Sequence, residues 1–113
     1  MAGRVPSVEL LWWEGCPGWE DALRMLREEM SAAGLDPGSI EVREVGTDAD
    51  AEREEFVGSP TVRVDGRDVQ PPGVEPVGLS CRVYRLRDGR ISPLPDPRDV
   101  RDTLLEAIEG GDE

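Results

Sequence analysis

The sequence predicts one α/β domain over residues 1–109, in which a central mixed sheet of about four strands is flanked by helices and accompanied by a small extra hairpin. Three observations lead to this prediction. An apolar strand is followed at once by a long amphipathic helix within residues 8–33. Two short alternating runs meet at Asp65-Gly66, a dipeptide typical of β-hairpin turns. Finally, Asp96-Pro97 starts another helical pattern, which ends at Gly110-Gly111.

The first strand and the first helix give the strongest signals. Val8–Trp13 is apolar at consecutive positions in its second half, as in a strand that is buried on both faces of a sheet. Pro17 fits the first helical position, so we expect Cys16 at or beside the N-cap, and Gly34 ends the helix. Apolar side chains recur between these ends at helical spacing: Trp19, Ala22, Leu23, Leu26, Met30 and Ala33.

The following segments predict shorter elements. Ile40–Val45 alternates between apolar and charged residues, as an edge strand does, and Thr47–Val57 is typical of a short helix capped by its threonine. Pro71–Gly78 is rich in Pro and Gly and has no period, which indicates an ordered surface loop. Cys81–Leu86 alternates again before a turn at Asp88-Gly89, which predicts the small extra hairpin. We expect residues 110–113 to form a disordered tail with an acidic end.

The charge of the chain excludes some partners. Its 113 residues include 25 acidic residues and 13 Arg, but no Lys and no His, which gives a net charge of −12. Such a chain repels nucleic acids and anionic membrane surfaces, so neither is an expected partner. No apolar run approaches the ~20 residues that span a bilayer, and the first residues lack the pattern of a secretory signal. We therefore expect a cytoplasmic protein, and nothing in the sequence indicates its oligomeric state.

The missing residue types exclude several chemistries. Without His the chain has no imidazole base for a hydrolase triad and lacks the usual nitrogen ligand for zinc. Without Lys it has no Schiff-base lysine and no P-loop lysine. The two cysteines do not have the spacing of a zinc site, so we expect no metal centre and no cofactor. Cys16 and Cys81 are then the main candidates for covalent chemistry.

Two opposing influences act on the Cys16 thiol. A helix N-terminus carries partial positive charge and favours the thiolate, which is the nucleophilic form. Glu14, Glu20 and Asp21 are close in sequence, and negative charges oppose ionisation of a thiol. Arg82, next to Cys81, could supply a positive charge if its loop folds over Cys16.

A cysteine-proline pair that opens the first long helix, together with Ser59-Pro60-Thr61 just before a hairpin, resembles the thioredoxin and glutaredoxin superfamily. In that superfamily a cis-proline lies beside the reactive cysteine, so the resemblance implies that Pro60 is cis and that Cys16 is reactive. The segments 15–19, 58–62 and 78–84 are more narrowly similar to a group of bacterial thioredoxin-like proteins. Some of its members carry selenocysteine where Cys16 stands, and the group resembles segments found near alkylmercury lyases.

The sequence departs from the dithiol pattern of that superfamily at position 19. A thioredoxin-type site has its second cysteine three residues after the first, where this chain has Trp19. The dithiol cycle therefore cannot run within the Cys-Pro-Gly-Trp motif. Three alternatives remain: Cys81 resolves Cys16 across the fold, a low-molecular-weight thiol resolves it, or the chain has no redox cycle.

The predicted function is that of a thiol-dependent redox protein, in which Cys16 is the nucleophile toward a thiol or disulfide substrate. The alternatives are capture of a soft metal or electrophile such as mercury by Cys16 and Cys81, and an interaction module without chemistry. Each candidate also has a purely structural interpretation, for example a cysteine buried as a small apolar residue, or Pro60 as a proline at a strand start. Beside the catalytic Cys16 and Cys81, the expected substrate-positioning residues are Pro17, Trp19, Ser59, Pro60, Thr61 and Arg82.

Overall fold

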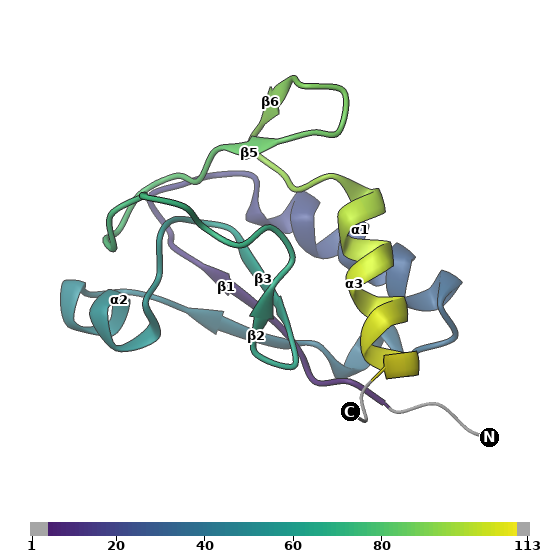
Figure 1. Cartoon of the computed structure of the whole chain (residues 1–113). Coiled ribbons are helices and arrows are strands. Elements are labelled where there is room, and N and C mark those ends of the chain that lie inside the picture. The colour runs from purple at the N-terminus through teal and green to yellow at the C-terminus, as the bar shows by residue number, and fades with distance from the viewer. Residues whose placement is uncertain (1–4, 111–113) are drawn as a thin grey trace.

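The sheet places β1 (Val8–Trp12) at its centre (Figure 1). The computed structural model describes residues 5–110, and its four-stranded sheet has the order β2-β1-β3-β4. β1 runs parallel to β2 (Glu41–Glu44) and antiparallel to β3 (Thr61–Val64), which pairs in turn with the short β4 (Arg67–Asp68). The mixed α/β architecture with a sheet of about four strands is thus confirmed.

Helices cover both faces of the sheet (Figure 1). α1 (Trp19–Ala32) and α3 (Pro97–Gly110) pack on one face, and α2 (Asp48–Glu54) lies on the other. A single 3-10 turn, η1 (Pro37–Ser39), connects α1 to β2. Alternation along β1 sends neighbouring side chains to opposite faces, so this one strand contributes to two cores.

The two cores differ in size. The larger core joins the sheet to α1 and α3, and its buried residues are Val8, Leu10, Ala22, Leu26, Met30, Val62, Val64, Val69, Val100 and Leu104. The smaller core lies under α2 and consists of Leu11, Val45, Ala51 and Phe56. Because each fully buried aliphatic side chain contributes about 1.5–3 kcal/mol, the larger core supplies most of the stabilisation from apolar burial.

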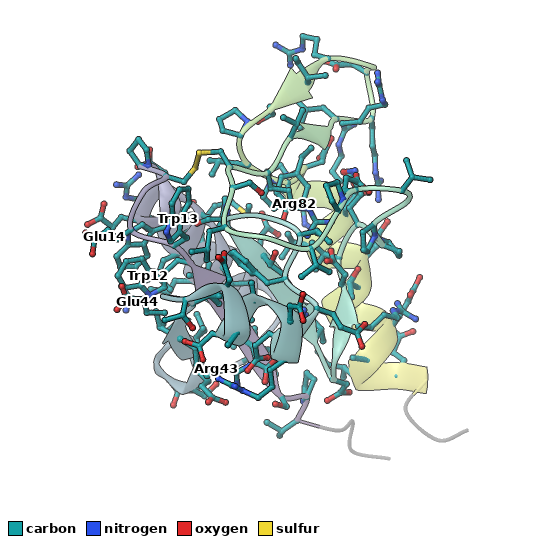
Figure 2. All side chains as sticks on the ribbon, turned by 90° about the vertical axis from the view of Figure 1, so that its left-hand side faces the viewer. Trp12, Trp13, Glu14, Arg43, Glu44 and Arg82 are labelled. Carbon is teal, nitrogen blue, oxygen red and sulfur yellow. A yellow bond between two sulfur atoms is a disulfide. The ribbon has the colours of Figure 1, made fainter. Side chains whose placement is uncertain are left out.

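β2 is an edge strand, as its alternating charges predicted. Its Arg43 donates to three carboxylates, those of Glu9, Glu41 and Glu54, at 3.0, 3.1 and 2.9 Å. These contacts raise the pKa of Arg43, although burial by itself opposes that shift. Figure 2 labels Arg43 near the outer border of the sheet, and the cluster keeps this rim charged.

Both predicted hairpins are present. Asp65 and Gly66 have φ values of 52° and 81°, the left-handed pair that a two-residue turn between β3 and β4 requires. The second hairpin joins β5 (Tyr84–Arg85) to β6 (Ile91–Ser92) and stands at one end of the molecule (Figure 1). Its first strand is shorter than the predicted run over 81–86, because the backbone around Cys81 pairs with Ser59 instead.

The first helix begins later than the sequence predicted. Gly18, with φ 99°, is the N-cap of α1, and the helix starts at Trp19. Pro17 is therefore not the first helical residue, and Cys16 lies two positions before the cap in a turn closed by a 3.1 Å bond from its own N–H to the Trp13 carbonyl. Gly18 permits this later start of the helix because glycine adopts positive φ without a steric penalty.

The other helix ends follow local signals. The Thr47 hydroxyl accepts a 3.0 Å bond from Asp50 N–H and caps α2, as predicted. α2 ends at Glu54, before the predicted limit of Val57, because Glu55 turns the chain at φ 53° and Phe56 enters the smaller core. α3 continues through Gly110, the first residue of the expected tail, and residues 111–113 lie outside the described part of the chain.

Asp96 caps α3, and its removal should make stability less dependent on pH. Its carboxylate accepts bonds from the side chain and N–H of Arg98 and from Arg87 N–H, which hold the pKa of Asp96 well below its usual range. Its stabilising effect is therefore complete above about pH 4 and is lost as pH falls through the lowered folded-state pKa. Asp96→Ala should cost about 1 kcal/mol at pH 7, as N-cap losses do, and clearly less at pH 3.

Urea denaturation of wild type and the Asp96→Ala variant at both pH values measures this difference. Asp96→Asn is the matched control, because it keeps a cap oxygen but has no charge to titrate. If the difference in free energy of unfolding between wild type and Asp96→Ala stays constant from pH 7 to pH 3, the lowered pKa assigned to Asp96 is contradicted.

Candidate functional site

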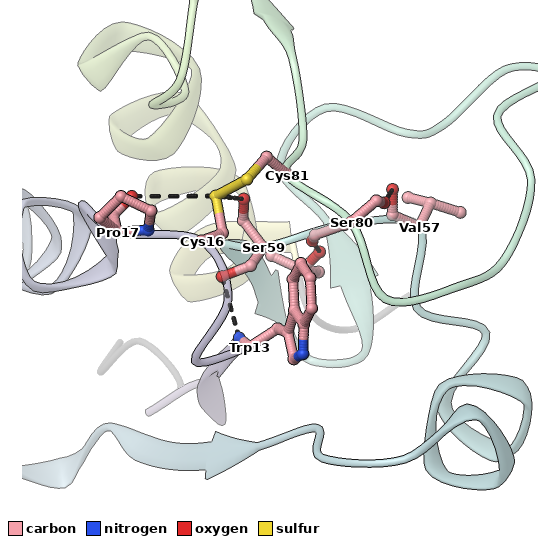
Figure 3. The surroundings of a disulfide bond; sticks show 9 residues. Trp13, Cys16, Pro17, Val57, Ser59, Ser80 and Cys81 are labelled. Carbon is pink, nitrogen blue, oxygen red and sulfur yellow. Dashed lines mark hydrogen bonds between the residues drawn. A yellow bond between two sulfur atoms is a disulfide. The ribbon is translucent and has the colours of Figure 1, made fainter.

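Cys16 and Cys81 form a disulfide bond, with their Cα atoms 5.3 Å apart (Figure 3). The bond joins the turn before α1 to the chain just before β5, across a sequence separation of 65 residues. Within residues 5–110 no cysteine remains free. Of the three alternatives left open by the sequence, the structure thus contains the arrangement that the first one needs, in which Cys81 reaches Cys16.

Ser59 holds the two cysteine-bearing segments together. Its hydroxyl accepts a 3.0 Å bond from Trp13 N–H, which fixes the turn that follows β1. Its own N–H donates to the Ser80 carbonyl at 2.8 Å, and its carbonyl accepts from Arg82 N–H at 2.9 Å. The backbone of Ser59 therefore binds the residues on both sides of Cys81, as an isolated parallel bridge.

The two sulfurs differ in their surroundings. Cys16 is only 5% exposed, and its Sγ lies 3.6 Å from the Ser59 carbonyl oxygen and 3.8 Å from that of Pro17 (Figure 3). A disulfide sulfur carries no hydrogen, so these are contacts here, whereas a reduced Cys16 thiol could donate to either oxygen. Cys81 is exposed, and the disulfide lies at the border of the molecule in Figure 2.

Three further predicted residues line the base of this site. The Ser59-Pro60 peptide bond is cis, as the resemblance implied, and both residues are buried. The Pro60 carbonyl accepts a 2.5 Å bond from the Tyr84 hydroxyl, and burial raises the pKa of that hydroxyl. Thr61 donates through Oγ1 to the Gly58 carbonyl at 2.7 Å. Residues 58–61 are thereby fixed from both sides.

Arg82 does not act on Cys16 as we expected. Its side chain is 3% exposed and points into the protein, where it donates to Asp68 at 2.7 Å and to the Gln70 carbonyl at 2.5 Å. Its guanidinium also lies 3.3 Å from Thr61 Oγ1 and 4.5 Å from the centroid of the Tyr84 ring. The segment that contains Cys81 and Arg82 does fold over Cys16, but the positive charge of Arg82 is paired with Asp68 and does not face the Cys16 sulfur.

Gly58 allows this segment to approach closely, so Gly58→Ala should lower the free energy of unfolding by at least about 2 kcal/mol. Gly58 has φ +140°, and a Cβ placed there would lie 2.9 Å from both N and Cα of Arg82. Positive φ strains any other residue, and here the backbone of the Cys81 segment must also shift. Urea denaturation of the oxidised protein measures the loss.

Gly66→Ala is the control for this prediction. Gly66 has φ +81° but no heavy atom within 4 Å of a placed Cβ, so its replacement adds backbone strain without a clash. Equal losses in the two variants would show that the contact between Gly58 and the Arg82 backbone carries no energetic cost.

Of the remaining predicted positioning residues, Trp19 packs against the larger core and Pro17 contacts the Cys16 sulfur. Trp19 stacks on Trp12, with ring centroids 4.3 Å apart and an interplanar angle of 15°, and both pack against the larger core. Pro17 is exposed and contributes its carbonyl oxygen beside Cys16.

Sequence reasoning missed the roles of Asp68 and Gln70, because no local pattern connects a hairpin strand with an arginine that follows a loop.

The described residues contain neither a metal-ligand cluster nor a membrane-spanning helix. Within residues 5–110 no group of three or more His, Cys, Asp or Glu side chains could hold a metal ion. In the same part of the chain no helix has the length and hydropathy to cross a bilayer. No protein-family model, curated protein or solved structure matches this chain.

Proposed function

We propose that this chain is a thioredoxin-like protein that carries out thiol–disulfide exchange through the Cys16–Cys81 pair. The bond between these two cysteines is the observation that carries the proposal. The strand order β2-β1-β3-β4 supports the resemblance. The position of the cysteine pair supports it too. Because β1 pairs antiparallel with β3, the residues that follow Trp12 lie close to the residues that precede Thr61.

Exchange would proceed in two balanced steps. An outside thiolate attacks one sulfur of the pair and forms a mixed disulfide with it, while the other cysteine leaves as a thiolate and takes up a proton. A second molecule of a low-molecular-weight thiol then attacks the outside sulfur of the mixed disulfide. This step releases the outside disulfide and a second protein thiol, so two electrons and two protons reach the chain. The reverse sequence reduces a substrate disulfide.

Burial favours Cys81 as the sulfur that meets the outside partner. A thiolate must reach the sulfur that it attacks, and Cys81 is exposed whereas Cys16 is 5% exposed. The carbonyl oxygens of Pro17 and Ser59 also crowd the Cys16 sulfur with electron-rich atoms. Cys16 would then be the resolving thiol, which reverses the roles that we expected from the sequence.

Turnover of a glutathione mixed disulfide by the reduced protein tests the function. Cys81→Ser should abolish catalytic turnover, and Cys16→Ser should reduce it, because without Cys16 only an outside thiol can resolve the mixed disulfide at Cys81. With an aromatic disulfide reagent, Cys16→Ser should react through Cys81 at least about tenfold faster than Cys81→Ser reacts through Cys16. Unchanged turnover in both variants would overturn the function, whereas faster reaction of Cys16 would overturn only the assignment of roles.

Capture of a soft metal ion is a second candidate, favoured by the short distance between the two cysteines. Thiolates are the ligands that such ions prefer, and a reduced pair with Cα atoms 5.3 Å apart could offer two sulfurs to one ion. Retention of mercury by the reduced protein, lost on either cysteine change and accompanied by no disulfide turnover, would support capture over exchange.

The disulfide also bears on the cellular compartment in which the protein is found. Stable disulfides belong to oxidising compartments, while those in the cytosol of most organisms are transient and catalytic or redox-sensing. A cytoplasmic location, which we expected from the sequence, therefore fits the proposed function only if the Cys16–Cys81 bond opens and closes.

A further inference from the structure

We propose that Arg82 is a positioning residue that holds Cys81 beside Cys16 when both cysteines are reduced. The inference rests on the proposed function, since it concerns a disulfide that opens and closes. It assigns to one buried side chain the role of keeping the two thiols close together after the bond has opened.

The contacts of Arg82 do not depend on the disulfide. Its guanidinium donates to Asp68 of β4 at 2.7 Å, to the Gln70 carbonyl at 2.5 Å and to Thr61 of β3 at 3.3 Å. It also faces the ring of Tyr84, 4.5 Å from its centroid. All of these partners lie in the folded body of the protein, so opening the S–S bond removes none of them.

The residues around Cys81 are held at both ends of the segment. The preceding residues 71–77 are exposed and have no regular structure, but Leu79 packs against the smaller core, and the buried Tyr84 donates to the Pro60 carbonyl. Between these ends, apart from the disulfide, Ser59 makes two backbone bonds with Ser80 and Arg82, and the Ser80 hydroxyl lies 3.5 Å from the Val57 carbonyl oxygen. Val83 is 62% exposed, so the buried side chain of Arg82 is the interior anchor that lies next to Cys81.

The groups that surround Arg82 explain why the anchor is strong. Burial by itself opposes the charged form, but Tyr84, Asp68 and Glu75 together keep the pKa of Arg82 above its usual value. The guanidinium thus stays charged while it is 3% exposed, and bonds between charged groups are the stronger class of hydrogen bond. Removing it would leave Asp68 without its partner and the 80–82 segment without a side chain fixed in the interior.

The anchor should appear as a high effective concentration of one thiol toward the other. In the oxidised protein the S–S bond keeps Cys81 in place with or without Arg82. In the reduced protein a segment without its anchor gains freedom, which must be lost again when the bond closes. Loss of Arg82 should therefore weaken the disulfide relative to the dithiol, an effect that equal destabilisation of both forms would not produce.

Equilibration with mixtures of reduced and oxidised dithiothreitol measures this balance, in which one protein disulfide and one dithiol exchange two electrons and two protons. For Arg82→Gln we expect the equilibrium constant for disulfide formation to fall at least about tenfold, or about 30 mV for a two-electron couple. Arg82→Lys keeps a cation opposite Asp68 but loses the fork that reaches Gln70, so it should recover part of this loss. Arg85→Gln is the control, because the exposed Arg85 side chain contacts the Gly89 carbonyl.

An equilibrium constant for Arg82→Gln within twofold of that for Arg85→Gln would overturn the inference. If Arg82→Gln unfolds when reduced, Arg82→Lys decides, and a wild-type value for that variant would overturn the inference too. The measurement needs no substrate of the protein, so absence of substrate turnover leaves it intact. A disulfide that no dithiothreitol mixture opens would instead overturn the proposed function.

Discussion

Reduction of the Cys16–Cys81 disulfide should lower the free energy of unfolding by about 4 kcal/mol. The bond closes a loop across 65 residues of sequence, and in the chain-entropy treatment a loop of this size restricts the unfolded chain by about that amount. The two cores remain when the bond opens, because the loop 79–83 that carries Cys81 contributes only Leu79 to them. Leu79 lies at the border of the smaller core. Urea denaturation with and without reductant measures the difference.

The variant with both Cys16→Ser and Cys81→Ser is the control for this effect. It should have the stability of the reduced wild type and show no response to reductant, because it has no bond to lose. A double variant as stable as the oxidised wild type would mean that the disulfide contributes nothing to the folded state.

Asp68→Ala should cost about 3–5 kcal/mol, the range observed when one partner of a buried ion pair is removed. The pair that it forms with Arg82 is nearly closed to solvent, with side-chain exposures of 11% for Asp68 and 3% for Arg82. Without the carboxylate the guanidinium would keep its charge in the interior and donate only to the neutral oxygens of Thr61 and Gln70. Thermal or urea denaturation of the oxidised protein gives the loss.

Asp88→Ala is the matched comparison, since Asp88 also pairs with an arginine, Arg90, but in solvent. Its removal should leave stability close to that of wild type, because exposed ion pairs contribute little. Combining Asp68→Leu with Arg82→Met should restore much of the stability that Asp68→Ala loses, as an apolar pair leaves no buried charge. A loss for Asp68→Ala as small as that for Asp88→Ala would contradict the buried-pair interpretation.

Local signals account for what the sequence predicted well. The turn at Asp65-Gly66, the Thr47 cap and the Asp96-Pro97 helix start each depend on neighbouring residues, and each is present. The amphipathic pattern of α1 is equally local, and its residues Ala22, Leu26 and Met30 are buried as expected. A helix between parallel strands and a hairpin between antiparallel ones account for the pairs β1–β2 and β3–β4, whereas the non-local pairing of β1 with β3 was not predicted.

The site could be predicted only in part, because it depends on contacts between distant segments. The cis peptide bond at Pro60 came from the resemblance, and the proximity of Cys81 to Cys16 was one of three open alternatives. The direction of the Arg82 side chain could not be predicted, since it is decided by Asp68 and Gln70 on a different hairpin. The position of Cys16 relative to the helix was wrong for a local reason, the positive φ of Gly18.

The Arg43 cluster on the outer strand of the sheet has a consequence for self-association. An exposed strand edge carries unpaired backbone groups, to which a strand from another molecule can add. On β2 such addition would have to strip water from Arg43 and from the carboxylates of Glu9, Glu41 and Glu54 that surround it. The same ion pairs that fasten β2 to its neighbours therefore work against fibre growth from this side of the protein.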